Sequence, residues 1–147
     1  MNALNRIRVG GRAARGLRVA LGLGVLALAG LAHAQMSPVG TWRSVDDEGK
    51  PKAQTRITQQ GDGANAVLVG HVDKLLRAGA DPNVLCDKCP GARKDKPVVG
   101  MELFRLNQPK ENGVWEGGKI LDPENGKEYT VRLTPIDGGA KLQVRGS

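Results

Sequence analysis

Apolar and polar residues alternate in seven short runs that follow an N-terminal segment of a different pattern. In the clearest run, Tyr129, Val131 and Leu133 alternate with polar neighbours. A period of two is typical of a strand with one buried face and one face in water. The expected strands are residues 39–45, 53–59, 66–72, 98–106, 114–121, 128–133 and 140–145.

Two of these strands are expected to form a hairpin, because the residues between them are turn formers. Asp122 suits the first turn position, and Pro123 fixes φ at the second. Asn125-Gly126 then supplies the left-handed backbone that reverses the chain. The pair Gly117-Gly118 lies inside the first strand, where it indicates a bulge or a sharp bend at a barrel corner. Close approach of a ligand to bare backbone is the alternative for this pair.

Short strands without a helical run predict an all-β fold, either an antiparallel sandwich or an up-and-down barrel. One segment, about residues 77–97, shows no regular alternation. Connections of this length are uncommon unless they are tied down or functional. We therefore expect a single domain over residues 35–147 that carries one long loop.

Residues 1–34 have the pattern of a secretory signal peptide. The segment starts with a head that contains five Arg and no acidic residue, continues with an apolar run over residues 19–31, and ends in Ala32-His33-Ala34. The run is shorter than the roughly 20 residues that a spanning helix needs. We predict a helical Sec-type signal cleaved after Ala34, with the mature chain in the periplasm or secreted and not stably inserted in a membrane. An uncleaved anchor is the alternative.

Removal of this segment changes the charge of the chain. The full sequence has 22 Lys and Arg against 15 Asp and Glu; without the five Arg of the signal, 17 − 15 leaves +2 in place of +7. A nucleic-acid binder is expected to keep a basic face and several stacking aromatics. The mature chain has only four aromatic residues, and its positive and negative charges are interleaved, so we expect no nucleic-acid partner.

The cysteines Cys86 and Cys89 have three interpretations. A disulfide that pins the long loop is the default in an oxidising compartment. A redox-active pair would need a helix N-terminus, and a zinc half-site would need two further ligands. His71 is the one histidine left after processing, and a structural role is expected for it. We predict no metal and no cofactor.

The acidic residues near the hairpin turn suggest no catalytic pair. General acid–base catalysis by carboxylates requires two of them in one cleft. The sequence gives no reason to place any two of these side chains together, so turn positions and solvated strand faces are the expected roles. The residues in question are Glu116, Asp122, Glu124 and Glu128.

Several short motifs, spread in order over the mature chain, resemble one bacterial family, catalogued as domain of unknown function 2147. They are Gly40-Thr41-Trp42, Gly49-Lys50-Pro51, Cys86 and Cys89, residues 94–97 with Gly100, residues 115–120, Asp122-Pro123 with Gly126-Lys127 and Tyr129, and Leu142 with residues 144–146. The resemblance implies an exported, mostly periplasmic protein with a small antiparallel barrel like those of lipocalins and fatty-acid-binding proteins. It implies no activity.

The resemblance also implies one strand more than this sequence contains. Similar members continue for about another strand after the residues that match Arg145-Gly146, whereas this sequence stops at Ser147. We therefore expect a barrel that is incomplete at its C-terminus. An open edge of this kind exposes unpaired backbone groups and favours self-association.

Three functions are consistent with the sequence. The first is a non-catalytic binding module for a small apolar or amphipathic ligand, with Trp42, Trp115 and Tyr129 as the candidate ligand-binding residues, although core packing also suits them. The second is an envelope protein that binds other proteins through the long loop or a sheet edge. The third is an enzyme, either one that exchanges thiols and disulfides through the cysteine pair or one of an unrecognised kind.

Overall fold

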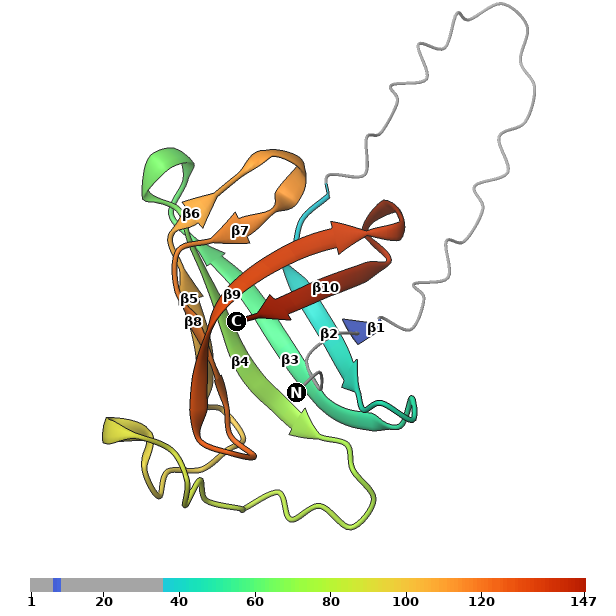
Figure 1. Cartoon of the computed structure of the whole chain (residues 1–147), viewed down its shortest axis with the longest axis vertical. Coiled ribbons are helices and arrows are strands. Elements are labelled where there is room, and N and C mark those ends of the chain that lie inside the picture. Colours follow the sequence, from blue (N-terminus) through green and yellow to red (C-terminus); the bar gives the residue numbers. More distant parts are fainter. Residues whose placement is uncertain (1–6, 9–35) are drawn as a thin grey trace, which may run out of the picture.

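The computed structural model describes residues 7–8 and 36–147, which form strands joined by turns and short 3₁₀ segments (Figure 1). The strands are β1 (Ile7–Arg8), β2 (Gly40–Val45), β3 (Pro51–Gln60), β4 (Val67–Leu75), β5 (Glu102–Leu106), β6 (Gln108–Pro109), β7 (Trp115–Glu116), β8 (Lys119–Asp122), β9 (Lys127–Ile136) and β10 (Lys141–Gly146). The 3₁₀ segments are η1 (Gly63–Asn65), η2 (Gly91–Arg93), η3 (Glu111–Gly113) and η4 (Asp137–Gly139). Within this part of the chain no helix has the length and apolarity needed to cross a membrane.

The strands form one antiparallel up-and-down sheet that curves into an open barrel. Its order is β1-β2-β3-β4-β5-β8-β9, and β10 pairs with both β9 and β1. β6 continues β5, so these two form one bent strand. β7 and β8 both lie against β9 and form a second bent strand. The predicted all-β, antiparallel up-and-down fold is confirmed. Over residues 36–147 the barrel is not closed, because β2 and β10 do not pair.

Alternation along the strands produces two clusters of buried apolar side chains. The first fills the barrel, and both tryptophans belong to it, with exposed fractions of 4% for Trp42 and 5% for Trp115. Leu103 packs against both clusters and so links them. The second cluster lies under the long loop and consists of Val72, Cys86, Cys89, Val98, Met101 and Leu121.

The predicted hairpin is present, with β8 and β9 paired from Asp122 opposite Lys127 onward. The amide of Gly126 donates to the carbonyl of Asp122 at 2.8 Å, and Gly126 has the left-handed φ of 72° that the turn requires. The pair Gly117-Gly118 separates β7 from β8, and Gly117 has φ of 84°. A Cβ at either glycine would overlap with atoms of the neighbouring strand, so the predicted bend is confirmed.

Several predicted boundaries are wrong. The strand expected over residues 98–106 begins only at Glu102, because Val98 bonds to the loop through its amide and the Val84 carbonyl, 3.0 Å apart. The strand expected to end at Leu133 continues to Ile136. Pro135 lies opposite Leu142, near the end of β9. Proline has no N–H to donate, and at this position its absence removes no hydrogen bond between β9 and β10.

The predicted signal peptide lies outside the described residues, except for β1. The two residues of β1 pair antiparallel with β2 on one side and with β10 on the other. Ile7 lies opposite Ser44 of β2 and Leu142 of β10.

Candidate ligand-binding cavity

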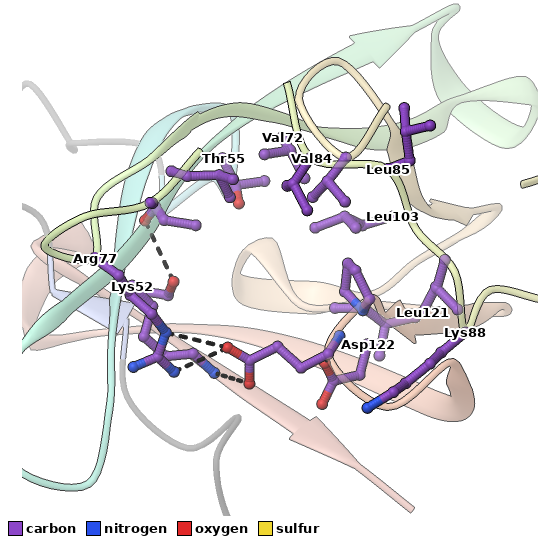
Figure 2. Close-up of a pocket in the computed structure, with 18 of the residues that line it drawn as sticks. Lys52, Thr55, Val72, Arg77, Val84, Leu85, Lys88, Leu103, Leu121 and Asp122 are labelled. Carbon is purple, nitrogen blue, oxygen red and sulfur yellow. Dashed lines mark hydrogen bonds and ion pairs between the residues drawn. The ribbon is translucent and has the colours of Figure 1, made fainter. Parts of the chain in front are cut away.

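The long loop crosses one end of the barrel and encloses a cavity of about 420 Å³ (Figure 2). Three parts of the chain form its walls: the facing ends of β2 to β4, the loop, and the turn between β8 and β9. Its lining residues include Ser44, Lys52, Ala53, Thr55, Val72, Leu75, Arg77, Ala80, Val84, Leu85, Lys88, Val98, Leu103, Ile120, Leu121, Glu124 and Val144.

The floor of the cavity is apolar because it lies where the two core clusters meet. Val72, Val98 and Leu121 come from the second cluster, and Ile120 and Val144 come from the first. Each presents a branched aliphatic side chain without a polar atom. An apolar group placed on this floor would lose contact with water, which is favourable by about 25 cal/mol for each Å² buried.

The loop adds apolar side chains that are not buried. Leu85 is 51% exposed and Val84 is 38% exposed, and both line the cavity (Figure 2). Apolar side chains are expected to be covered where the fold allows it, so an exposed pair beside an apolar cavity suggests a surface that a ligand would cover.

Charged side chains gather on one side of the cavity (Figure 2). Glu124 accepts hydrogen bonds from Nε of Arg77 at 3.2 Å and from its Nη2 at 2.8 Å. The ammonium group of Lys52 lies 3.2 Å from the other carboxylate oxygen, and its side chain is 13% exposed. Arg77 also lies 3.6 Å from a carboxylate oxygen of Asp46. The group therefore contains two cations and two carboxylates that can pair with one another or with a polar ligand.

The cations keep Glu124 ionised. Partial burial of the carboxyl raises its pKa, but the hydrogen bond from Arg77 and the charge and hydrogen bond of Lys52 lower it further than burial raises it. The pKa of Glu124 therefore lies below its usual value. The pKa of Asp46 is also lowered, mainly by the hydrogen bond from the Lys50 amide.

The loop is held in place by a disulfide and by the hairpin. Cys86 and Cys89 are bonded, with an S–S distance of 1.99 Å, and are 1% and 2% exposed. The amide of Cys86 donates to the carbonyl of Lys96 at 2.8 Å. The carbonyl of Lys88 rests where a Cβ of Gly126 would lie, so the glycine of the turn lets the loop pack on the hairpin. The default interpretation of the cysteine pair is thus confirmed.

The three aromatic residues predicted to bind ligand do not line this cavity. Trp42 and Trp115 lie in the first cluster, and Nε1 of Trp42 donates to the Pro38 carbonyl at 2.6 Å. Tyr129 is half-buried against the same cluster, and its hydroxyl accepts from Asn125 at 3.1 Å. Contact of these residues with a ligand stays a prediction.

Sequence reasoning missed the charged residues that the structure brings together. Lys52, Arg77 and Glu124 lie in three segments, and no local motif links them. A weak signal was present in Val84-Leu85, an apolar pair inside a polar loop.

Of the other carboxylates near the hairpin, Asp122 lines the cavity together with Glu124, contrary to expectation, whereas Glu116 and Glu128 do not line it. Glu116 pairs with Arg132 at 2.9 Å, and Glu128 pairs with Arg93 at 2.7 Å. Asp122 accepts from the Glu124 amide at 2.9 Å and so shapes the turn. Among the residues that the structure describes, no three His, Cys, Asp or Glu side chains form a group that could hold a metal ion.

Comparison with known proteins identifies a family. A family model described as an uncharacterized protein conserved in bacteria (DUF2147) matches residues 40–147. No curated protein and no solved structure matches the chain.

Proposed function

The chain belongs to the bacterial DUF2147 family, and within it we propose that this protein is a non-catalytic binding module for a small apolar or amphipathic ligand. The observation that carries the proposal is the 420 Å³ cavity with an apolar floor and a charged group on one side. Small-molecule sites have volumes of about 300–1,000 Å³, are lined mainly by apolar side chains, and contain a few polar groups that fix orientation.

The layout of the cavity suggests how such a ligand would lie. Its apolar part would rest on Val72, Val98 and Leu121 and would cover Leu85 of the loop. Its polar end would face Lys52, Arg77 and Glu124, which contact one another on one side of the cavity (Figure 2). A ligand without a polar end would leave the ion pairs unchanged and would bind through the apolar floor alone.

Export and a lipocalin-like role belong to the same proposal. The signal pattern of residues 1–34 and the buried disulfide support an oxidising compartment such as the periplasm. An up-and-down barrel with a cavity at one end supports the likeness to lipocalins, which hold one small ligand. A carrier of this kind needs no catalytic group, and the carboxylate of Glu124 is engaged by Arg77 and Lys52.

A cavity-filling substitution tests the proposal. Ala53 lines the cavity from β3, where an aromatic residue suits a strand, so Ala53→Phe should fill part of the space without disturbing the backbone. The matched control is Ala64→Phe, because Ala64 is exposed in η1. The amphipathic dye 8-anilinonaphthalene-1-sulfonate serves as the probe in a fluorescence titration.

We expect the dye to bind the native protein with one saturable site. Affinity should fall at least tenfold in Ala53→Phe and stay within twofold in Ala64→Phe. Equal affinities in all three proteins, or no saturable binding to the native protein, would contradict the proposal.

A further inference from the structure

The cations beside the cavity already bind one carboxylate, that of Glu124. Its Oε1 accepts hydrogen bonds from Nε and Nη2 of Arg77, at 3.2 and 2.8 Å, and its Oε2 lies 3.2 Å from Nζ of Lys52. Two cations from separate segments therefore contact both oxygens of the same group. Proteins commonly recognise carboxylates through charge-assisted contacts of this kind. The side chain of Glu124 thus occupies an anion site on one side of the cavity.

The two partners of this ion pair differ in exposure. The side chain of Lys52 is 13% exposed, whereas that of Glu124 is 51% exposed. A charged group that is largely removed from water needs an opposite charge beside it, because leaving it unpaired is costly. An exposed carboxylate can return to water at little cost, and exposed ion pairs contribute little to stability. Lys52 is therefore the fixed partner of the pair, and Glu124 is the replaceable one.

The hairpin turn does not depend on the carboxylate of Glu124. The Gly126 amide donates to the Asp122 carbonyl at 2.8 Å, and the Glu124 amide donates to the Asp122 carboxylate at 2.9 Å. Neither hydrogen bond uses the side chain of Glu124. The carboxylate can therefore move away from the cations while the turn, and with it one wall of the cavity, keeps its shape.

The charges that line the cavity also favour an anionic ligand. Cations and carboxylates are equal in number there, namely Lys52, Arg77, Lys88, Asp87, Asp122 and Glu124. Once the carboxylate of Glu124 moves away, the cations are in excess. Within the part of the chain that the structure describes, Lys88 makes no ion pair (Figure 2). A cationic head group would instead lie beside the ammonium group of Lys52 and be repelled by it.

We propose that the ligand of this cavity is an amphipathic carboxylate, whose head group takes the place of the Glu124 side chain between Lys52 and Arg77. Its apolar tail lies on the floor formed by Val72, Val98 and Leu121. Glu124 is the internal counter-ion of the site, and the ligand competes with it for the same cations. This inference rests on the proposed ligand-binding function and narrows it to one class of head group.

Three ligands that share one alkyl chain test the proposal by calorimetry at pH 7. Octanoate has an anionic head, 1-octanol has an uncharged head, and octyltrimethylammonium has a cationic head. Each is titrated below the concentration at which it forms micelles. Octanoate should bind about fivefold or more tightly than octanol, and octyltrimethylammonium should bind more weakly than octanol.

Two variants assign the effect to the ion pair. Glu124→Gln removes the competing charge and should raise the affinity for octanoate by about threefold or more, although it removes ion pairs from the fold. A purely structural role of Glu124 would lower affinity and stability together. Lys52→Met keeps the apolar stem without the ammonium group, and it should lower the affinity for octanoate by about tenfold and that for octanol by less.

Glu128→Gln is the matched control. Glu128 is paired with Arg93 at 2.7 Å, as Glu124 is with Arg77, but it does not line the cavity. This change removes the same charge from the same hairpin. The affinity for octanoate should therefore stay within about twofold of the native value.

The head-group proposal is overturned if octanol or octyltrimethylammonium binds as tightly as octanoate, or if Glu124→Gln lowers the affinity for octanoate. Either result leaves the proposed ligand-binding function in place, because a ligand still enters the cavity. If none of the three ligands binds while 8-anilinonaphthalene-1-sulfonate does, the head-group proposal alone fails. If the dye does not bind either, the proposed function fails with it.

Discussion

The disulfide offers a sharp test, because it should hold one wall of the cavity and stabilise the whole domain. Replacing both cysteines, Cys86→Ala with Cys89→Ala, opens a closed loop of four residues. The chain-entropy relation assigns about 2 kcal/mol to a loop of this size. Both sulfurs are almost fully buried in the second cluster, at 1% and 2% exposed, and losing their packing should cost about 1 kcal/mol each. The total expected loss is about 4 kcal/mol, a large share of the 5–15 kcal/mol typical of a domain.

Urea denaturation followed by tryptophan fluorescence measures this loss. Trp42 and Trp115 both lie in the first cluster, so their emission reports unfolding of the barrel and not of the loop alone. Leu103 packs against both clusters, and we therefore expect the loop and the barrel to unfold together. With a slope of about 1–3 kcal/mol per M, the urea midpoint should fall by more than about 1 M.

Reduced native protein is the control, because it lacks the disulfide bond but keeps both sulfurs. Its free energy of unfolding should lie between those of the native protein and the double variant. The reasoning would be refuted if the double variant unfolded within about 0.5 kcal/mol of the native protein and bound the dye with native affinity.

Three further predictions concern single residues. Glu124→Gln should lower the free energy of unfolding by about 1 kcal/mol at pH 7. Because the pKa of Glu124 is lowered in the folded state, the carboxylate stabilises the fold above its unfolded pKa of about 4.3, and this stabilisation is lost as pH falls below that value. Urea titrations between pH 5 and 3 should therefore show a smaller acid-induced loss of stability in the variant than in the native protein. Gly126→Ala should destabilise by more than Gly49→Ala in thermal melts, since both glycines have left-handed φ, of 72° and 79°, but only the first faces a backbone oxygen, that of Lys88; equal losses would exclude this packing contact. Trp42→Phe should cost about 1–3 kcal/mol in chemical denaturation, because the hydrogen bond of 2.6 Å to the carbonyl of Pro38 is lost in a buried place; an unchanged midpoint would argue against that bond.

The fold could be predicted from the sequence because apolar and polar residues alternate within the strands themselves. Tyr129, Val131 and Leu133 alternate with polar residues, and that pattern alone places one face of β9 in the core. The turn from Asp122 to Gly126 is likewise set by local backbone preferences, which act over four or five residues and do not depend on the rest of the chain.

The cavity could not be predicted in the same way, because its residues meet only in the folded chain. Arg77 and Glu124 are 47 positions apart, and neither stands in a recognisable motif. Val98 has the apolar character of a strand residue, yet its amide bonds to the carbonyl of Val84 in the loop. The aromatic side chains were predicted to bind ligand, but they lie in or against the core of the barrel. The cavity is lined mainly by aliphatic residues at the end of the barrel.

Native mass spectrometry of the protein purified from the periplasm of its own bacterium tests the central claim most directly. We predict a second species heavier than the protein by the mass of one small molecule, released when the protein is denatured and absent from Ala53→Phe expressed in the same cells. A single species at the mass of the polypeptide alone, in the native protein as in the variant, would contradict a ligand-binding role for the cavity.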